Sequence, residues 1–159
     1  MKKTSFRQLL RDPVMLLAFG FGSGLAPRAP GTFGTLAAIP FWWLLAGLSP
    51  AWYLVLVTAA ALLGCYLCGA ASEKLGVHDH GGIVWDEMVG YWLTMFMAPA
   101  GWAWALYGFA LFRLFDIVKP PPIRWIDRRV HGGVGIMLDD ILAGIFAALL
   151  LQLTALVIG

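Results

Sequence analysis

Five carboxylates stand out in this sequence as residues that could do chemistry together. They form two adjacent pairs and one single position: Asp86 with Glu87, Asp139 with Asp140, and Asp116. Carboxylates that lie close together repel one another unless a proton or a cation neutralises them. Mg²⁺ prefers oxygen ligands and usually combines a few carboxylates with water and a phosphate of the substrate. We therefore expect Mg²⁺ ligands at Asp86, Glu87, Asp139 and Asp140, and catalytic roles for Asp86, Asp116, Asp139 and Asp140.

Helix capping is the alternative interpretation of these acids. An aspartate near a helix N-terminus can accept hydrogen bonds from free backbone amides and offset the helix dipole. For Asp139 and Asp140 alone, both interpretations stand. Asp116 is expected near a helix C-terminus, where the dipole disfavours a carboxylate. Capping therefore does not explain the whole set.

Basic residues accompany the acids in the segment DIVKPPPIRWIDRRVHGG (116–133). Arginine can bind a phosphate through two hydrogen bonds, and lysine contributes a point charge. The alternative is that these residues anchor the chain to lipid head groups. His78 belongs to an HDH triplet and could contact a ligand, or lie in a solvated loop. The candidate phosphate-binding residues are Arg28, Lys119, Arg128 and His78.

The elements that must position these residues are predicted to be membrane helices. The chain is 60% hydrophobic and 13% charged, whereas soluble domains carry about 25% charged residues. Residues 29–72, 88–112 and 141–159 contain no charged side chain. A membrane-spanning helix needs roughly 20 mainly apolar residues. We expect an all-α, polytopic membrane bundle in which residues 1–159 form one domain.

The expected helices number about five spans and one short interfacial helix. Pro99 and Gly101 interrupt the second charge-poor stretch, 88–112, so we expect a helical hairpin over 83–118 rather than one long helix. The loops are expected at 23–34 and 72–82. The helices are expected at 13–22 (interfacial), 35–47 with a start borrowed from 32–34, 51–71, 83–98, 102–118 and 139–158.

Charge asymmetry sets the expected topology. Lysine and arginine near spans favour the cytoplasmic side. The basic segments 2–28 and 113–129 can both be cytoplasmic only if an even number of crossings separates them, which the hairpin provides. A single crossing at 88–112 would place five basic residues outside. On the hairpin topology the helix ends that carry Asp86, Asp116 and Asp139 meet at the cytoplasmic face.

Several functions are disfavoured by what the sequence lacks. The net charge of +2 is too small to suggest a nucleic-acid partner. Cys65 and Cys68 lie in an apolar run and are interpreted as packing residues. Arg11 and Asp12 disfavour a cleaved signal peptide. No nucleotide-binding loop or cysteine-phosphatase motif is present, which leaves a carboxylate-bound metal that activates water against a phosphoryl group.

Three long segments resemble the bacterial phosphatidylglycerophosphatase A family: APRAPGTFGTLAAIP (26–40), HDHGGIVWDEMVGYW (78–92) and FDIVKPPPIRWIDRRVHGGVGIMLDDILAG (115–144). The resemblance covers nearly all of the chain after about residue 13. It implies a Mg²⁺-dependent enzyme of the bacterial inner membrane that hydrolyses phosphatidylglycerophosphate to phosphatidylglycerol and phosphate. The positions that match the family are Asp86, Glu87, Asp116, Asp139, Asp140, Arg28, Lys119 and Arg128.

Two rival functions use the same residues differently. A membrane phosphotransferase would pass the phosphoryl group to an acceptor other than water. A small ion transporter would line its path with carboxylates near the middle of the membrane, whereas the acids here are expected at helix ends. The sequence leaves the oligomeric state, the number of metal ions and the role of His78 open.

Overall fold

Helices form all the regular structure in residues 4–158, the part of the chain that the computed structural model describes. The N-terminal region contains two short α-helices and one 3₁₀ helix. The remainder contains four α-helices of 16 to 27 residues, one of 10 residues and one of 5 residues. Their bounds are α1 Phe6–Leu9, α2 Pro13–Ala18, η1 Gly20–Leu25, α3 Pro30–Leu45, α4 Pro50–Leu75, α5 Trp85–Thr94, α6 Trp102–Val118, α7 Ile123–Asp127 and α8 Gly132–Ile158. The predicted all-α class is confirmed.

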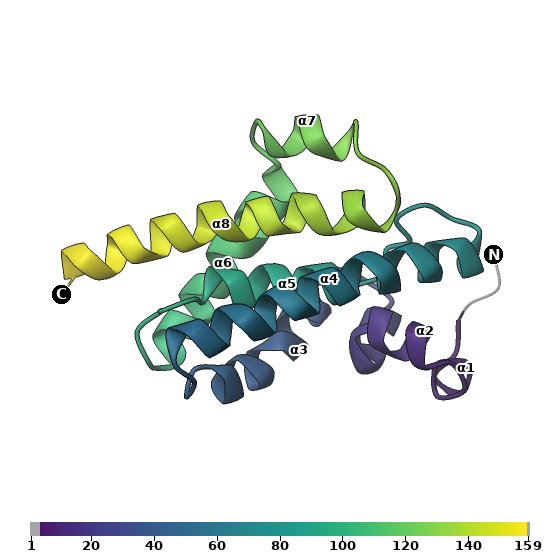
Figure 1. Ribbon diagram of the computed structural model, residues 1–159, viewed down its shortest axis with the longest axis horizontal. Helices are drawn as coiled ribbons and strands as arrows, with labels where there is room; N and C mark the ends of the chain where they lie inside the picture. Colours follow the sequence, from purple (N-terminus) through teal and green to yellow (C-terminus); the bar gives the residue numbers. More distant parts are fainter. Residues whose placement is uncertain (1–3, 159) are drawn as a thin grey trace.

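Two helices have the length and apolar character needed to cross a membrane. Within the described residues these are α4, with 26 residues, and α8, with 27 residues, so each is about 40 Å long at 1.5 Å per residue. Both expose large apolar side chains, such as Leu62 and Leu156. Figure 1 shows that they run in opposite directions, with the C-terminal end of α8 far from α1 and α2.

The short helix α5 lies at the centre of the bundle and packs against α3, α4 and α8. Eight of its ten residues are buried. Glycines allow it to approach α8 closely: a Cβ at Gly144 would lie 2.6 Å from the carbonyl oxygen of Gly90, and one at Gly90 would lie 2.9 Å from that of Asp140. This crossing brings the start of α5 beside the acidic segment of α8.

The predicted hairpin over 83–118 is present as α5 and α6, joined by residues 95–101. The bounds of α6 match the prediction, whereas α5 is shorter than the predicted 83–98 because it ends at Thr94. A helix of 10 residues is about 15 Å long, so α5 alone does not have the length of a span.

Two predicted loops are partly helical. The helix predicted over 35–47 starts at Pro30, which takes the first-turn position that suits proline. The helix predicted over 51–71 continues to Leu75 and ends at Gly76, whose positive φ of 66° closes the helix. The longer α4 carries Lys74 to Asp12, which caps α2, and their side chains are 2.5 Å apart.

The last helix begins seven residues before the predicted start at residue 139, and this correction changes how its two acids are interpreted. Residues 132–135 contain three glycines, which are poor helix formers and so look like loop in the sequence. Here Gly133 lets α8 pack against α4, because a Cβ at this position would lie 1.8 Å from the Cys65 carbonyl oxygen. Asp139 and Asp140 therefore lie about two turns inside α8, where they cannot cap its N-terminus.

Candidate active site

Three carboxylates from two helices lie close together at the start of α5. Asp86 and Glu87 lie in the first turn of α5, and Asp140 lies on α8. One ligand oxygen of each lies within 4.8 Å of those of the other two. In this acidic triad (Asp86, Glu87 and Asp140), Asp86 is 6% exposed, Asp140 is 3% exposed, and the partly buried side chain of Glu87 is 14% exposed.

Each member of the acidic triad has a buried oxygen without a hydrogen-bond partner among the described residues. These atoms are Asp86 Oδ1, Glu87 Oε2 and Asp140 Oδ2. Burying a carboxylate without a partner costs several kcal/mol by rough estimate. An all-oxygen, negatively charged donor set suits a hard divalent cation. The triad therefore fits the metal that the sequence predicts.

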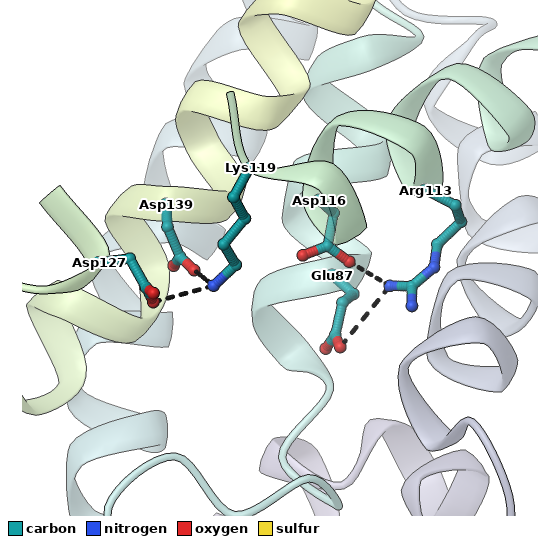
Figure 2. Close-up of polar contacts among 6 residues, drawn as sticks. All are labelled: Glu87, Arg113, Asp116, Lys119, Asp127 and Asp139. Carbon is teal, nitrogen blue, oxygen red and sulfur yellow. Dashed lines mark hydrogen bonds and ion pairs between the residues drawn. The ribbon is translucent and has the colours of Figure 1, made fainter. Parts of the chain in front are cut away.

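Arg113 on α6 links the acidic triad to Asp116. Its Nη1 donates a hydrogen bond to Asp116 Oδ2 and lies 3.9 Å from Glu87 Oε1. Figure 2 shows the guanidinium between the two carboxylates, with Asp116 on the same helix and Glu87 on α5. The side chain of Arg113 is 16% exposed. Asp116, which the sequence places near the end of a helix, thus joins the site through an arginine.

Lys119, which follows Asp116 by three residues and caps the C-terminus of α6, forms a second ionic cluster. Its Nζ lies 2.5 Å from Asp139 Oδ2 and 2.8 Å from Asp127 Oδ1. Burial of Lys119 disfavours the charged form, but the hydrogen bonds to Asp127 and Asp139 outweigh it and raise the pKa of Lys119 above its ordinary value. Lys119 therefore carries a positive charge at the edge of the acidic region.

Helix geometry separates the adjacent acids of α8. Successive side chains on an α-helix point about 100° apart, so Asp140 joins the acidic triad while Asp139 contacts Lys119. The second oxygen of Asp139, Oδ1, is also buried without a partner in the described part of the chain. Both acids thus lie at the site, in different surroundings.

The remaining predicted phosphate-binding residues lie outside these two clusters. Arg28 is exposed between η1 and α3, and Arg128 is exposed at the end of α7. His78 accepts a hydrogen bond from the backbone amide of Gly132 at 3.0 Å, and its ring centroid lies 5.6 Å from that of His131. His78 therefore holds the loop before α5 against the start of α8.

A crevice of about 410 Å³ lies between the loop before α3 and the loop before α5. Pro27, Pro30, His80 and Gly82 are among the residues that line it. Its wall at Pro30 is next to Gly31, where a Cβ would lie 2.1 Å from Glu87 Oε1. The end of the crevice at Pro30 therefore lies one residue along the chain from the part of α3 that is close to Glu87.

Arg113 and Asp127 are the residues of these two clusters to which the sequence predictions give no role. Arg113 opens the basic segment 113–129, which serves only to predict the topology. A usable signal exists, because residues three apart on a helix are neighbours and Arg113 precedes Asp116 by three positions.

The helices and the site together define a class: a helical protein with two helices apolar and long enough to cross a membrane, and an acidic cluster that could hold a metal ion beside basic side chains. The phosphatidylglycerophosphatase A family model matches residues 16–155. The chain belongs to this family of phosphatases, as the resemblance predicts.

Relatives with curated descriptions agree with this assignment. Phosphatidylglycerophosphatase A of Escherichia coli strain K12 is 52% identical over 143 residues, which cover 89% of this chain and 83% of the relative. Phosphatidylglycerophosphatase A of Haemophilus influenzae is 49% identical over 142 residues, covering 88% and 87%. A candidate phosphatidylinositol-3-phosphatase of Bacteroides thetaiotaomicron is 40% identical over the full length of both chains. No solved structure matches this chain.

Proposed function

We propose that this protein removes the terminal phosphate of phosphatidylglycerophosphate and releases phosphatidylglycerol and inorganic phosphate. Membership of the family supports the substrate. The observation that carries the chemistry is the acidic triad, whose three buried, unpartnered carboxylate oxygens lie beside Arg113 and close to the Lys119 cluster. An acidic site with adjacent cations suits a phosphate monoester, which brings its own negative charge.

In this proposal Asp86, Glu87 and Asp140 hold Mg²⁺. A divalent cation bound there would polarise a phosphoryl oxygen and lower the pKa of a bound water. Asp139 remains a predicted further ligand through Oδ1, and its Oδ2 orients Lys119. Asp116 keeps Arg113 in place on the opposite side of the acidic triad.

The chain's basic residues bind the phosphate. Lys119 stays protonated because two carboxylates raise its pKa, so its charge can offset that of the phosphoryl group as the bond to the leaving group breaks. We assign Arg28, Arg128 and His78 to the same ligand as outer contacts. The crevice beside Pro27 and Pro30 has room for a head group.

We further propose that the protein is a multi-pass protein of the bacterial inner membrane, with the site at the cytoplasmic face. Residues 141–158 of α8 carry no charge and extend roughly 27 Å, close to the hydrocarbon thickness of about 30 Å. This length supports a site at one membrane boundary rather than at mid-depth. In this arrangement α3–α4 and α5–α6 are two inserted hairpins in the place of four of the five predicted spans, and α5, about 15 Å long, extends only partway across the bilayer.

The test is phosphate release by the purified protein in detergent. With phosphatidylglycerophosphate and Mg²⁺ we expect free phosphate, and with a chelator we expect none. Asp86→Asn should abolish release while the helical circular dichroism spectrum is retained. Phosphatidylinositol 3-phosphate is assayed as a second candidate substrate, because one relative is described as a phosphatidylinositol-3-phosphatase. Full activity in chelator or in Asp86→Asn would refute the proposed metal chemistry.

The same assay separates the two rival functions. A phosphotransferase would transfer the phosphoryl group to an added alcohol without stoichiometric free phosphate. A transporter would move ions across liposomes without lipid turnover. The boundary position of Asp140 on α8 argues against a mid-membrane ion path, because 18 uncharged residues follow it to the end of the described helix.

A further inference from the structure

We infer that Arg113 and the backbone at Gly31 form a clamp that positions the Glu87 carboxylate for cation binding. Arg113 comes from α6 and Gly31 from α3, whereas Glu87 lies on α5. The inference rests on the proposed function, because it assigns to these two residues the preparation of a metal ligand.

The two oxygens of Glu87 have different surroundings. Oε1 lies 3.9 Å from Arg113 Nη1, and a Cβ at Gly31 would lie only 2.1 Å from Oε1. Oε2 is buried and has no partner among the described residues. The clamp thus holds one oxygen and leaves the other available for a cation.

Gly31 is required for close approach rather than for an unusual backbone conformation, because it lies inside the first turn of α3. The nearest atom to an added Cβ is the end of the flexible Glu87 side chain, and Arg113 Nη1 would be 3.1 Å away. Alanine at this position can therefore be accommodated if Glu87 moves. The substitution displaces the carboxylate without changing any charge.

Arg113 also holds Asp116, and its Nε is buried without a partner in the described region. A long cation kept in place between two carboxylates restricts the rotamers of both. Residues that orient metal ligands through such contacts typically affect metal affinity by about 10- to 100-fold when replaced. Arg113 is therefore a positioning residue, which acts through Glu87 and Asp116.

Because Arg113 is positively charged, the inference can be tested by whether its removal strengthens or weakens cation binding. A positive charge close to a cation site repels the cation. If Arg113 served only to balance negative charge, its removal would tighten cation binding. If it positions Glu87, its removal weakens cation binding despite the more negative site.

The experiment measures Mn²⁺ binding to the purified full-length protein in detergent, by electron paramagnetic resonance of free Mn²⁺. Arg113→Met and Gly31→Ala should each raise the Kd for Mn²⁺ by about tenfold or more. Arg113→Lys, which keeps the charge and reaches one carboxylate, should give an intermediate Kd. In the phosphatase assay the same variants should need more Mg²⁺ for half-maximal rate.

Two matched controls keep the result specific. Gly69→Ala adds a Cβ at an ordinary distance of 3.5 Å from Gly133, and Arg124→Met removes an exposed arginine of α7. Both should bind Mn²⁺ as the wild type does. If Arg113→Met does not fold, Gly31→Ala and Arg113→Lys decide the matter.

Three outcomes would overturn the inference. Unchanged or tighter Mn²⁺ binding in folded Gly31→Ala and Arg113 variants would leave the proposed function standing and refute the clamp. Equal weakening in the two controls would also refute it. A wild-type protein that binds no Mn²⁺ would refute the proposed metal site and the clamp with it.

Discussion

Arg113 and Lys119 lie on the same helix end, and each contacts two carboxylates, yet their surroundings differ. Arg113 contacts a member of the acidic triad and is 16% exposed, whereas Lys119 is 25% exposed and contacts Asp127 and Asp139 outside the triad. In the proposed mechanism, Arg113 therefore positions a metal ligand of the protein itself, and the more exposed Lys119 contacts the anionic substrate. In this proposal the two similar ion-pair clusters have different roles, because one includes a member of the acidic triad and the other does not.

The largest effect is expected when the two adjacent acids of α8, Asp139 and Asp140, are replaced one at a time, because only Asp140 belongs to the acidic triad. Asp140→Asn removes a member of the acidic triad, so we expect loss of Mn²⁺ binding and phosphate release at the level seen with chelator. Asp139→Asn should weaken Mn²⁺ binding far less, because Asp139 is a predicted further ligand outside the acidic triad, and should lower turnover because Lys119 loses a partner. Mn²⁺ titration and phosphate release on both variants test this. Loss of Mn²⁺ binding in Asp139→Asn as complete as in Asp140→Asn would remove the distinction between the two clusters.

A smaller effect is expected for Lys119→Met. Removing one group that stabilises transition-state charge typically lowers the rate by about 10²- to 10³-fold. Mn²⁺ binding should be no weaker than in the wild type, since a positive charge has been removed near the site. The opposite response in Mn²⁺ binding to Arg113→Met would sharpen the comparison. Weaker Mn²⁺ binding in Lys119→Met would show that both cations position ligands.

The smallest effect concerns pH. The pKa of Lys119 is raised above its ordinary 10.5, so its contribution to stability is fully present below the unfolded pKa and is lost as pH rises through the folded pKa. The difference in Tm between wild type and Lys119→Met should therefore stay constant from roughly pH 7 to 9. Thermal unfolding in detergent across this range measures it. A difference that declines within the range would mean that the two carboxylates do not hold the proton on Lys119.

The part of the fold that the sequence predicts best is the charge-poor hairpin, because Pro99 and Gly101 mark the turn between its two helices, although α5 already ends at Thr94. The bounds of α6 follow from this pattern. The start of α8 does not follow from it, because Gly132, Gly133 and Gly135 have poor helix propensity. The helix nevertheless starts there because Gly133 packs closely against Cys65 and Gly69 of α4, a contact that only the folded chain provides.

The acidic residues of the site are predictable as a set, but their division is not. Asp86 and Glu87 lie at a helix start as predicted, and Asp116 lies at a helix end. The separation of Asp139 from Asp140 depends on the rotation of α8 about its axis, which local sequence does not determine. Arg113 escapes notice because an arginine at the end of an apolar helix also suits an anchor at the membrane surface.

In the proposed membrane arrangement, the uncharged part of α8 sets the depth of the acidic triad in the bilayer. Its roughly 27 Å would be the distance between Asp140 and the far membrane boundary. A thicker bilayer would draw the acidic triad below the level of lipid phosphates, and a thinner one would lift it toward water. In this arrangement the acyl-chain length of the surrounding lipids would affect the activity of the enzyme. It would set whether the phosphate of a substrate lipid and the carboxylates of the acidic triad lie at the same depth.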